Sequence, residues 1–195
     1  MDKIILKVKP YIQELFSRRT PSFLKYHNLA HTEKVVERTI EISKASPVPL
    51  NEKDFFCVIT AAWFHDTGHL FNELKDHEQA GADLMAAFLK SFQLEDSIIN
   101  EAAGCIMATR VPSNPKTAIE QIICDADTYH LGTRDFQHLD KLVWQELELR
   151  LNKPINNKVQ RSLLLLENHH FFTGYCRQLL STGKDRNIAQ LNMSL

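Results

Sequence analysis

The sequence contains little of what several classes of protein need. Only six of its 195 residues are glycine, which argues against an all-β protein with many tight turns. None of its four cysteines forms a C-x-x-C pair, and their spacing indicates neither a zinc ribbon nor a disulfide framework. We therefore interpret Cys57, Cys105, Cys124 and Cys176 as reduced, mostly buried thiols.

The chain also lacks a strong charge and a long apolar run. Its formal net charge is −1 and its pI is about 6.8, so no general attraction to a nucleic-acid polymer or an anionic membrane is expected. The leucine run 163–166 is far too short to span a bilayer, and the first ten residues lack the apolar core of a secretory signal. We expect a cytoplasmic protein with no membrane partner, and the sequence leaves a homo-oligomer open.

Apolar residues recur at helical spacing along most of the chain, which predicts an all-α protein of about eight or nine helices. No internal repeat or long linker divides it, so we expect a single domain over residues 1–195. The segment 117–129 also fits a strand, because IEQIIC is a short apolar run. The predicted helices reach from the start to Thr20 and then cover 29–43, 51–64, 77–92, 96–109, 117–131, 135–151 and 155–171, with shorter pieces after them.

One predicted helix is apolar on every side. The residues from Phe55 to Phe64 leave no polar face, so this helix should lie at the centre of the protein. It ends in His65-Asp66, and His69 follows after a Thr-Gly break. A carboxylate is rarely buried without a partner. The pair is therefore a hydrogen-bonded core feature, a helix terminus, or two ligands of a metal ion.

Further histidines and aspartates fit the third of these interpretations. His27 and His31 are four residues apart, so one helical face can carry both. Asp127 lies between apolar residues in IICDADTYHLG. Imidazole and carboxylate groups of this kind suit Zn, Fe, Mn, Ni or Co, with Mg also admitted. We expect such a divalent metal ion as the cofactor.

The order His31, His65-Asp66, Asp127 resembles the H…HD…D signature of the HD superfamily of metal-dependent phosphohydrolases. The resemblance covers about residues 26–132, and it implies a bundle of α-helices with the C-terminal helices, about 135–190, packed on it. Four segments carry it, namely YHNLAHT, HDTGH, HEQAGADLM and CDADTYHLG, which are similar to the family patterns Y-H-N-x-x-H, H-D-[IVT]-G-[HK], H-E-x-x-[GS]-A and D-A-D-L-x-x-L-G.

The resemblance implies a ligand set. By it, the metal ligands are His31, His65, Asp66 and Asp127. The family ligand is the aspartate after the alanine, which selects Asp127 over Asp125. Two residues two positions apart on a helix point about 200° apart, so Asp125 is expected to orient a ligand instead.

The resemblance also implies catalytic and substrate-binding residues. A protonated His27 or His69 would give a proton to the departing alkoxide. His77 would lie near phosphate, cap its helix, or belong to a weak second metal site. Three residues are tentative phosphate contacts that also fit ordinary surface or packing roles: Arg110, Lys116 and His170.

The implied function is hydrolysis of a phosphomonoester or phosphodiester in a small phosphorylated metabolite or nucleotide, by metal-activated water. The segment 101–110 has no histidine where a two-metal site would need one, so we expect one metal ion per chain. The same gap disfavours an HD-type di-iron oxygenase. A non-catalytic, regulatory HD module that binds metal or nucleotide remains the alternative. A zincin site is rejected because Gly68 interrupts the helix and Asp66 replaces the glutamate.

Overall fold

The computed structural model describes residues 1–71 and 75–195, and within these ranges it is all-α, as predicted. It has nine α-helices there, in agreement with the expected eight or nine. Two short 3-10 helices, η1 and η2, interrupt the series. The elements are α1 (Asp2–Arg19), α2 (Leu29–Lys44), α3 (Glu52–Phe64), η1 (Thr67–Phe71), α4 (His77–Lys90), α5 (Asp96–Ala108), α6 (Ala118–Asp127), η2 (Tyr129–Gly132), α7 (Phe136–Leu151), α8 (Lys158–Asn168) and α9 (Gly174–Asn192).

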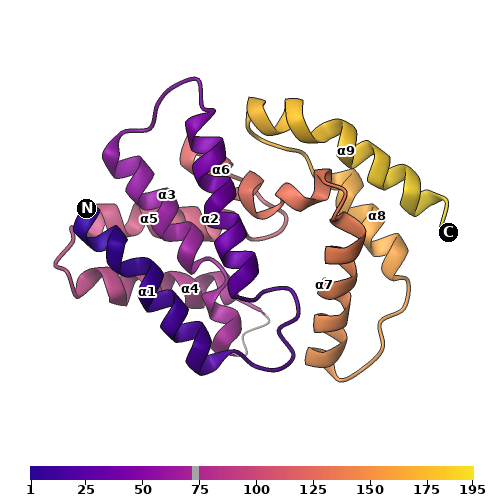
Figure 1. The fold of residues 1–195 in the computed structure, drawn as a ribbon, viewed down its shortest axis with the longest axis horizontal. Coiled ribbons are helices and arrows are strands. Elements are labelled where there is room, and N and C mark those ends of the chain that lie inside the picture. The colour runs from indigo at the N-terminus through magenta and orange to yellow at the C-terminus, as the bar shows by residue number, and fades with distance from the viewer. Residues whose placement is uncertain (72–74) are drawn as a thin grey trace.

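Helix α3 is the central element of the bundle, as its apolar sequence predicts. It packs against α1, α2, α4, α5 and α6 (Figure 1). Its N-terminus is capped by Asn51, whose side chain accepts a hydrogen bond from the backbone N–H of Asp54 at 2.8 Å. All nine residues from Phe56 to Phe64 are buried. The helix therefore ends inside the protein, with His65 as its C-cap.

The chain turns sharply after α3, and Gly68 lies in this turn. Gly68 does not have a positive φ, so it is not needed for backbone freedom. It is needed for space, because a Cβ there would lie 2.1 Å from the carbonyl oxygen of His77. The start of α4 thus packs directly onto the residues that follow His65 and Asp66. This close approach fixes the HD turn against a second helix.

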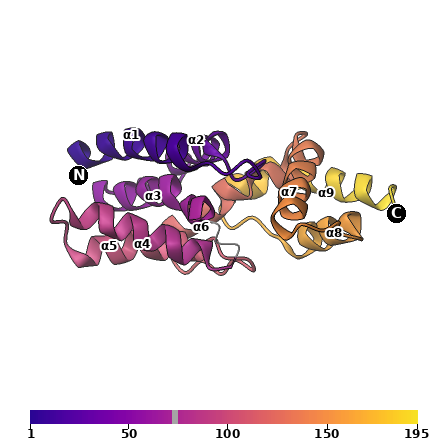
Figure 2. The ribbon, with the colours of Figure 1, turned by 90° about the horizontal axis from the view of Figure 1, so that it is seen from below.

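The C-terminal third of the chain contributes to two hydrophobic clusters. Phe171, Cys176 and Leu180 belong to the main core. Leu166 forms a second cluster with Leu131, Phe136 and Leu191, against which Leu163 packs. Figures 1 and 2 show α7 and α8 at the end of the molecule away from α1. The two parts are joined by η2, which packs against both α7 and α9. The expectation of short pieces at the C-terminus is wrong, since α9 has 19 residues.

The ambiguous segment 117–129 is helical, which confirms the helix and excludes the strand. The deciding local signal is a capping box. The Thr117 side chain accepts from the N–H of Glu120, and the Glu120 side chain accepts from the N–H of Thr117. Within the ranges described, no helix combines the length and apolar character that crossing a membrane requires.

Candidate metal centre

Three separate helices bring the predicted ligand residues together. His31 is in the first turn of α2, and its backbone N–H donates to the side chain of the N-cap Asn28 at 3.2 Å. His65 and Asp66 follow the buried end of α3. Asp127 is the last residue of α6. Each side chain therefore sits at a helix terminus, where packing of the helix fixes its position.

The four side chains lie within the spacing of one coordination sphere. Nε2 of His31 lies 3.2 Å from Oδ2 of Asp66 and 3.3 Å from Oδ1 of Asp127. Nε2 of His65 lies 3.2 Å and 3.6 Å from the same two oxygens. Ligands bound to one metal ion at about 2.1 Å lie roughly 3 to 4 Å from each other. The His31, His65 and Asp127 group could therefore hold a metal ion.

Buried polar atoms without hydrogen bonds support this fit. Nε2 of His31, Nε2 of His65 and Oδ2 of Asp66 are all buried and make no hydrogen bond in the described part of the chain. Nδ1 of His65 lies 2.8 Å from the carbonyl oxygen of Ala62, so it carries the hydrogen and leaves a lone pair on Nε2. A lone pair and a carboxylate oxygen facing each other are stabilised by a cation between them. The donor set thus fits a metal ion.

The electrostatics of the cluster point the same way. Burial by itself would lower the pKa values of His31 and His65, but Asp66 and Asp127 raise both, that of His65 to well above its ordinary value. Burial would likewise raise the pKa values of Asp66 and Asp127, but the neighbouring histidines hold them well below their usual range. The two carboxylates therefore stay ionised, and the site favours positive charge at its centre.

A second group of His and Asp side chains lies on the other side of Asp66. His27, Asp66 and His69 place their ligand atoms close enough together to hold a metal ion. The ring of His69 lies 4.3 Å from that of His27 and is stacked on that of His77 at 3.9 Å. Nε2 of His77 lies 3.8 Å from Oδ1 of Asp66 and 3.4 Å from Oε1 of Glu78. The structure thus brings all three predicted catalytic histidines to Asp66 or its immediate neighbours.

Helix α7 contributes two residues that the sequence did not indicate. Oε1 of Glu146 lies 2.7 Å from Nδ1 of His27, and Oε2 accepts hydrogen bonds from the backbone N–H groups of Tyr26 and His27. Nη1 of Arg150 lies 2.8 Å from Nδ1 of His69. Both charged side chains are only 3% exposed. Glu146 and Arg150 are four residues apart, so the sequence indicates that they share one face of the helix. It does not indicate which other part of the protein that face packs against.

Asp125 does not orient a metal ligand, which corrects that expectation. Its carboxylate accepts hydrogen bonds from the backbone N–H of Phe172 at 2.8 Å and from the backbone N–H and hydroxyl of Thr173, both at 2.7 Å. Thr173 is the N-cap of α9. Asp125 therefore fastens the start of α9 to α6, while Asp127 points to the other side of its helix.

The tentative phosphate contacts lie elsewhere. Arg110 pairs with Asp76 at 2.8 Å and with Glu78 at 3.5 Å, so carboxylates offset its charge. The side chains of Lys116 and His170 are exposed, and neither belongs to the His/Asp groups. His169 is the more buried of the two late histidines, and its Nε2 lies 3.0 Å from the hydroxyl of Thr128.

A cavity of about 370 Å³ adjoins the candidate metal centre. His31 and Asp127 are part of its wall, and α7 contributes Leu139 and Leu142. Arg38 lies on the same face of α2 as His31, two turns or about 10 Å further along the helix. Its guanidinium lies 4.3 Å from the centre of the Tyr129 ring. The cavity thus extends from the candidate metal centre to a region with apolar, aromatic and cationic side chains.

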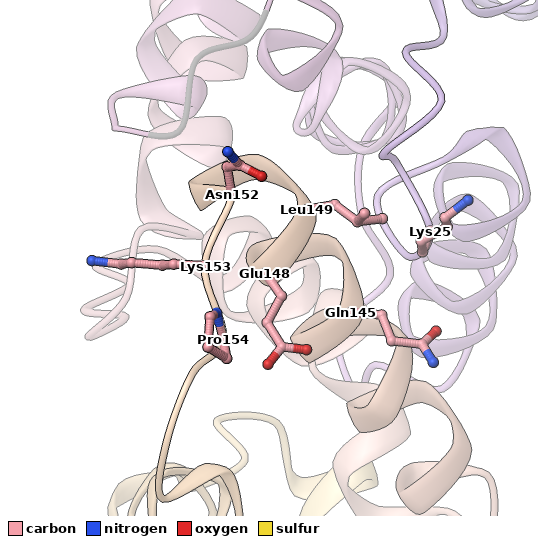
Figure 3. Close-up of a pocket in the computed structure, with 7 residues that line it drawn as sticks. All are labelled: Lys25, Gln145, Glu148, Leu149, Asn152, Lys153 and Pro154. Carbon is pink, nitrogen blue, oxygen red and sulfur yellow. The ribbon is translucent and has the colours of Figure 1, made fainter.

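A larger hollow, of about 500 Å³, lies beside the C-terminal part of α7. Figure 3 shows Lys25 facing Gln145 and Leu149 across it, with Lys153 beyond the end of the helix. None of its lining residues belongs to the His/Asp groups. We therefore assign the site by its chemistry and not by the size of the hollow.

Comparison with known proteins agrees with this geometry. The sequence profile of the HD domain matches residues 28–132, which contain all four predicted ligands. A crystal structure of a predicted HD superfamily hydrolase from an uncultured Thermotogales bacterium is similar, with a TM-score of 0.61 and 18% identity over 99% of this chain and 90% of that one. At that identity the likeness shows the fold alone. No curated protein matches the chain.

Proposed function

Because the chain belongs to the HD domain family, we propose that it is a metal-dependent phosphohydrolase acting on a small phosphorylated metabolite or nucleotide. The observation that carries the proposal is the convergence of His31, His65, Asp66 and Asp127. Buried atoms of the first three have no hydrogen-bond partner among the residues that the structure describes. We assign these four residues as the metal ligands. A divalent metal ion held there lowers the pKa of a bound water and offsets charge on phosphoryl oxygens.

Proton transfer to the leaving oxygen is assigned to His27. Its Nδ1 is held by the carboxylate of Glu146, which leaves Nε2 directed away from α7. Burial, together with the net effect of the neighbouring charges, lowers the pKa of His69 to about 2. A lowered pKa favours the neutral ring, so of the two expected proton donors we assign the role to His27.

The cavity beside Asp127 is the proposed site for the part of the substrate that leaves. It begins at two proposed ligands and extends along α2 to Arg38. Its volume of about 370 Å³ is in the range of small-molecule sites. Arg38 is paired with Glu41, so it is the remaining N–H groups of its guanidinium that favour a leaving group with hydrogen-bond acceptors. This supports a substrate larger than a simple alkyl phosphate.

Metal analysis of the purified protein, combined with a panel of phosphoesters, tests the proposal. We expect about one divalent transition metal per chain and turnover of at least one phosphomonoester or phosphodiester, abolished by chelation and restored by metal. Absence of divalent metal binding at micromolar concentrations would overturn the proposal. Retained metal without turnover across the panel would favour the regulatory module instead. Oxygen-dependent oxidation with about two irons per chain would favour an oxygenase.

A further inference from the structure

Arg150 determines which hydrogen-bonding face His69 presents to the site. Nη1 of Arg150 lies 2.8 Å from Nδ1 of His69, and the Arg150 side chain is 3% exposed. A guanidinium has five N–H donors and no acceptor, so Nδ1 of His69 is the acceptor of this hydrogen bond. A neutral imidazole that accepts at one nitrogen carries its hydrogen on the other. Nε2 of His69 therefore bears a hydrogen.

In the neighbouring histidines, His27 and His65, Nδ1 is the donor and not the acceptor. Nδ1 of His27 lies 2.7 Å from the carboxylate of Glu146, and Nδ1 of His65 lies 2.8 Å from the carbonyl oxygen of Ala62. Both partners are acceptors, so both histidines carry a hydrogen on Nδ1. This leaves the lone pair of His65 Nε2 for a metal ion, and it leaves Nε2 of His27 for the proton that it is proposed to transfer. Histidines that bind metal are typically held in this way, by an acceptor behind the ring. His69 has a donor behind its ring instead.

We propose that Arg150 makes His69 a hydrogen-bond donor to the substrate and prevents it from binding a second metal ion. Nε2 of His69 lies 3.9 Å from Oδ1 of Asp66, on the side of the ring that faces the cluster. An N–H group held there is positioned to donate to a phosphoryl oxygen and to stabilise the charge that develops on it. A protonated Nε2 has no lone pair for a metal ion. The role in catalysis rests on the proposed phosphohydrolase function, and the effect on metal binding does not.

In this proposal Arg150 is a positioning residue, because it acts through His69. Nη1 of Arg150 also lies 3.5 Å from Oε1 of Glu146. The partner of His69 and the partner of His27 are thus in contact with each other on α7. The range matched by the HD domain profile ends at residue 132, so this partner comes from the C-terminal third of the chain. Helix α7 therefore sets the number of metal ions as well as the orientation of the donor.

The tautomer of His69 can be read directly by long-range ¹H–¹⁵N correlation NMR on Zn²⁺-loaded protein with ¹⁵N-labelled histidine. The His69 signals are assigned by comparison with His69→Gln. We expect the Nε2–H tautomer in the wild type at pH 7, and a shift toward Nδ1–H in Arg150→Met. Arg150→Lys keeps a donor and should retain the wild-type tautomer. A wild-type His69 in the Nδ1–H or imidazolium form would overturn the inference, and this measurement does not depend on turnover.

Metal stoichiometry and kinetics provide the second readout. We expect Arg150→Met to gain affinity for a second metal ion, with kcat reduced by about 10- to 100-fold and KM changed less. The matched control is Arg161→Met, because Arg161 is exposed on α8. Unchanged metal stoichiometry in a folded Arg150→Met protein would overturn the proposed effect on metal binding. If no phosphoester is turned over but the NMR and metal results hold, the phosphohydrolase function fails and the role of Arg150 in selecting one metal ion stands.

Discussion

The carboxylate of Glu146 lies 2.7 Å from Nδ1 of His27, although 119 residues separate them in the chain. Its second oxygen accepts hydrogen bonds from the backbone N–H groups of Tyr26 and His27. One buried side chain on α7 thus fixes both the loop that precedes α2 and the ring of a proposed catalytic histidine. We therefore expect Glu146 to contribute to stability and to the proposed catalysis.

This arrangement predicts a dependence of stability on pH. Burial would raise the pKa of Glu146, but the hydrogen bond and charge of His27 and the two backbone N–H groups lower it from 4.5 to about 2. A group whose pKa is lowered on folding stabilises the protein above its unfolded pKa, and this stabilisation is lost as the pH falls through its folded pKa. Glu146→Gln should therefore be less stable than the wild type above about pH 4.5, by roughly 3 kcal/mol, and the difference should shrink toward pH 2.

Urea unfolding of both proteins at several pH values between 2 and 7 measures this difference. The control is Glu167→Gln, because Glu167 is exposed on α8. A difference in the free energy of unfolding that stays constant over this pH range would contradict the prediction.

Substitutions of Asp127 and Asp125 should have different effects, the first on metal binding and the second on stability. Asp127→Ala removes a proposed ligand, so we expect loss of most bound metal and a fall in metal affinity of more than about 100-fold, since loss of an outer partner already costs 10- to 100-fold. Plasma mass spectrometry of the purified variant measures the metal. Asp185→Ala, at an exposed position on α9, is the control. Wild-type metal content in Asp127→Ala would remove Asp127 from the ligand set.

Asp125→Asn should lower the stability of the protein and leave its metal content unchanged. An amide has one acceptor oxygen, whereas the Asp125 carboxylate accepts from three donors of Phe172 and Thr173. We expect the free energy of unfolding to fall by about 1–3 kcal/mol, with metal stoichiometry unchanged. Thermal or urea unfolding and metal analysis on the same preparation check both parts. Loss of metal from the folded variant would restore the interpretation that Asp125 orients a ligand.

The turn after Asp66 should tolerate no side chain at Gly68. An added Cβ would lie 2.1 Å from the carbonyl oxygen of His77, so Gly68→Ala must displace α4 from the turn. We expect a loss of stability of about 1–3 kcal/mol or more and weaker metal binding. Gly104→Ala is the matched control, since its nearest contact would be a side-chain oxygen at 3.5 Å and alanine favours its helix. Equal melting temperatures for the two variants would contradict the steric argument.

Filling the cavity should affect substrates according to their size. Leu142 lines the cavity from α7 and is not one of the proposed ligands. We expect Leu142→Trp to raise KM by about 10-fold or more for substrates with large leaving groups and to affect small ones less, because only the former need the space. Metal content should not change. Leu179→Trp, at an exposed position on α9, controls for the added tryptophan. Equal effects on large and small substrates would place the leaving group outside this cavity.

The sequence by itself determined the helical class and singled out the four candidate ligand residues. Apolar residues at helical spacing are a local signal, and the HD turn, His31 and Asp127 lie in short segments whose pattern is visible without the fold. Even the ambiguous segment 117–129 contains a local signal that favours a helix over a strand, namely the capping box of Thr117 and Glu120.

The tertiary structure alone decided what surrounds those ligands. In the sequence, Glu146 and Arg150 are indistinguishable from the charged residues of a surface helix. In the structure, Glu146 contacts His27 in the loop before α2, and Arg150 contacts His69 in the turn after α3. Likewise, only the packing of α9 shows that Asp125 holds Thr173 and not a metal ligand. Contacts between residues so distant in sequence depend on how whole helices pack. A local sequence pattern predicts a helix and its apolar face, but it does not predict which other helix packs against that face. The sequence thus indicated the candidate metal-binding residues, and the fold decided the hydrogen-bond partners that set the orientation of the histidines around them.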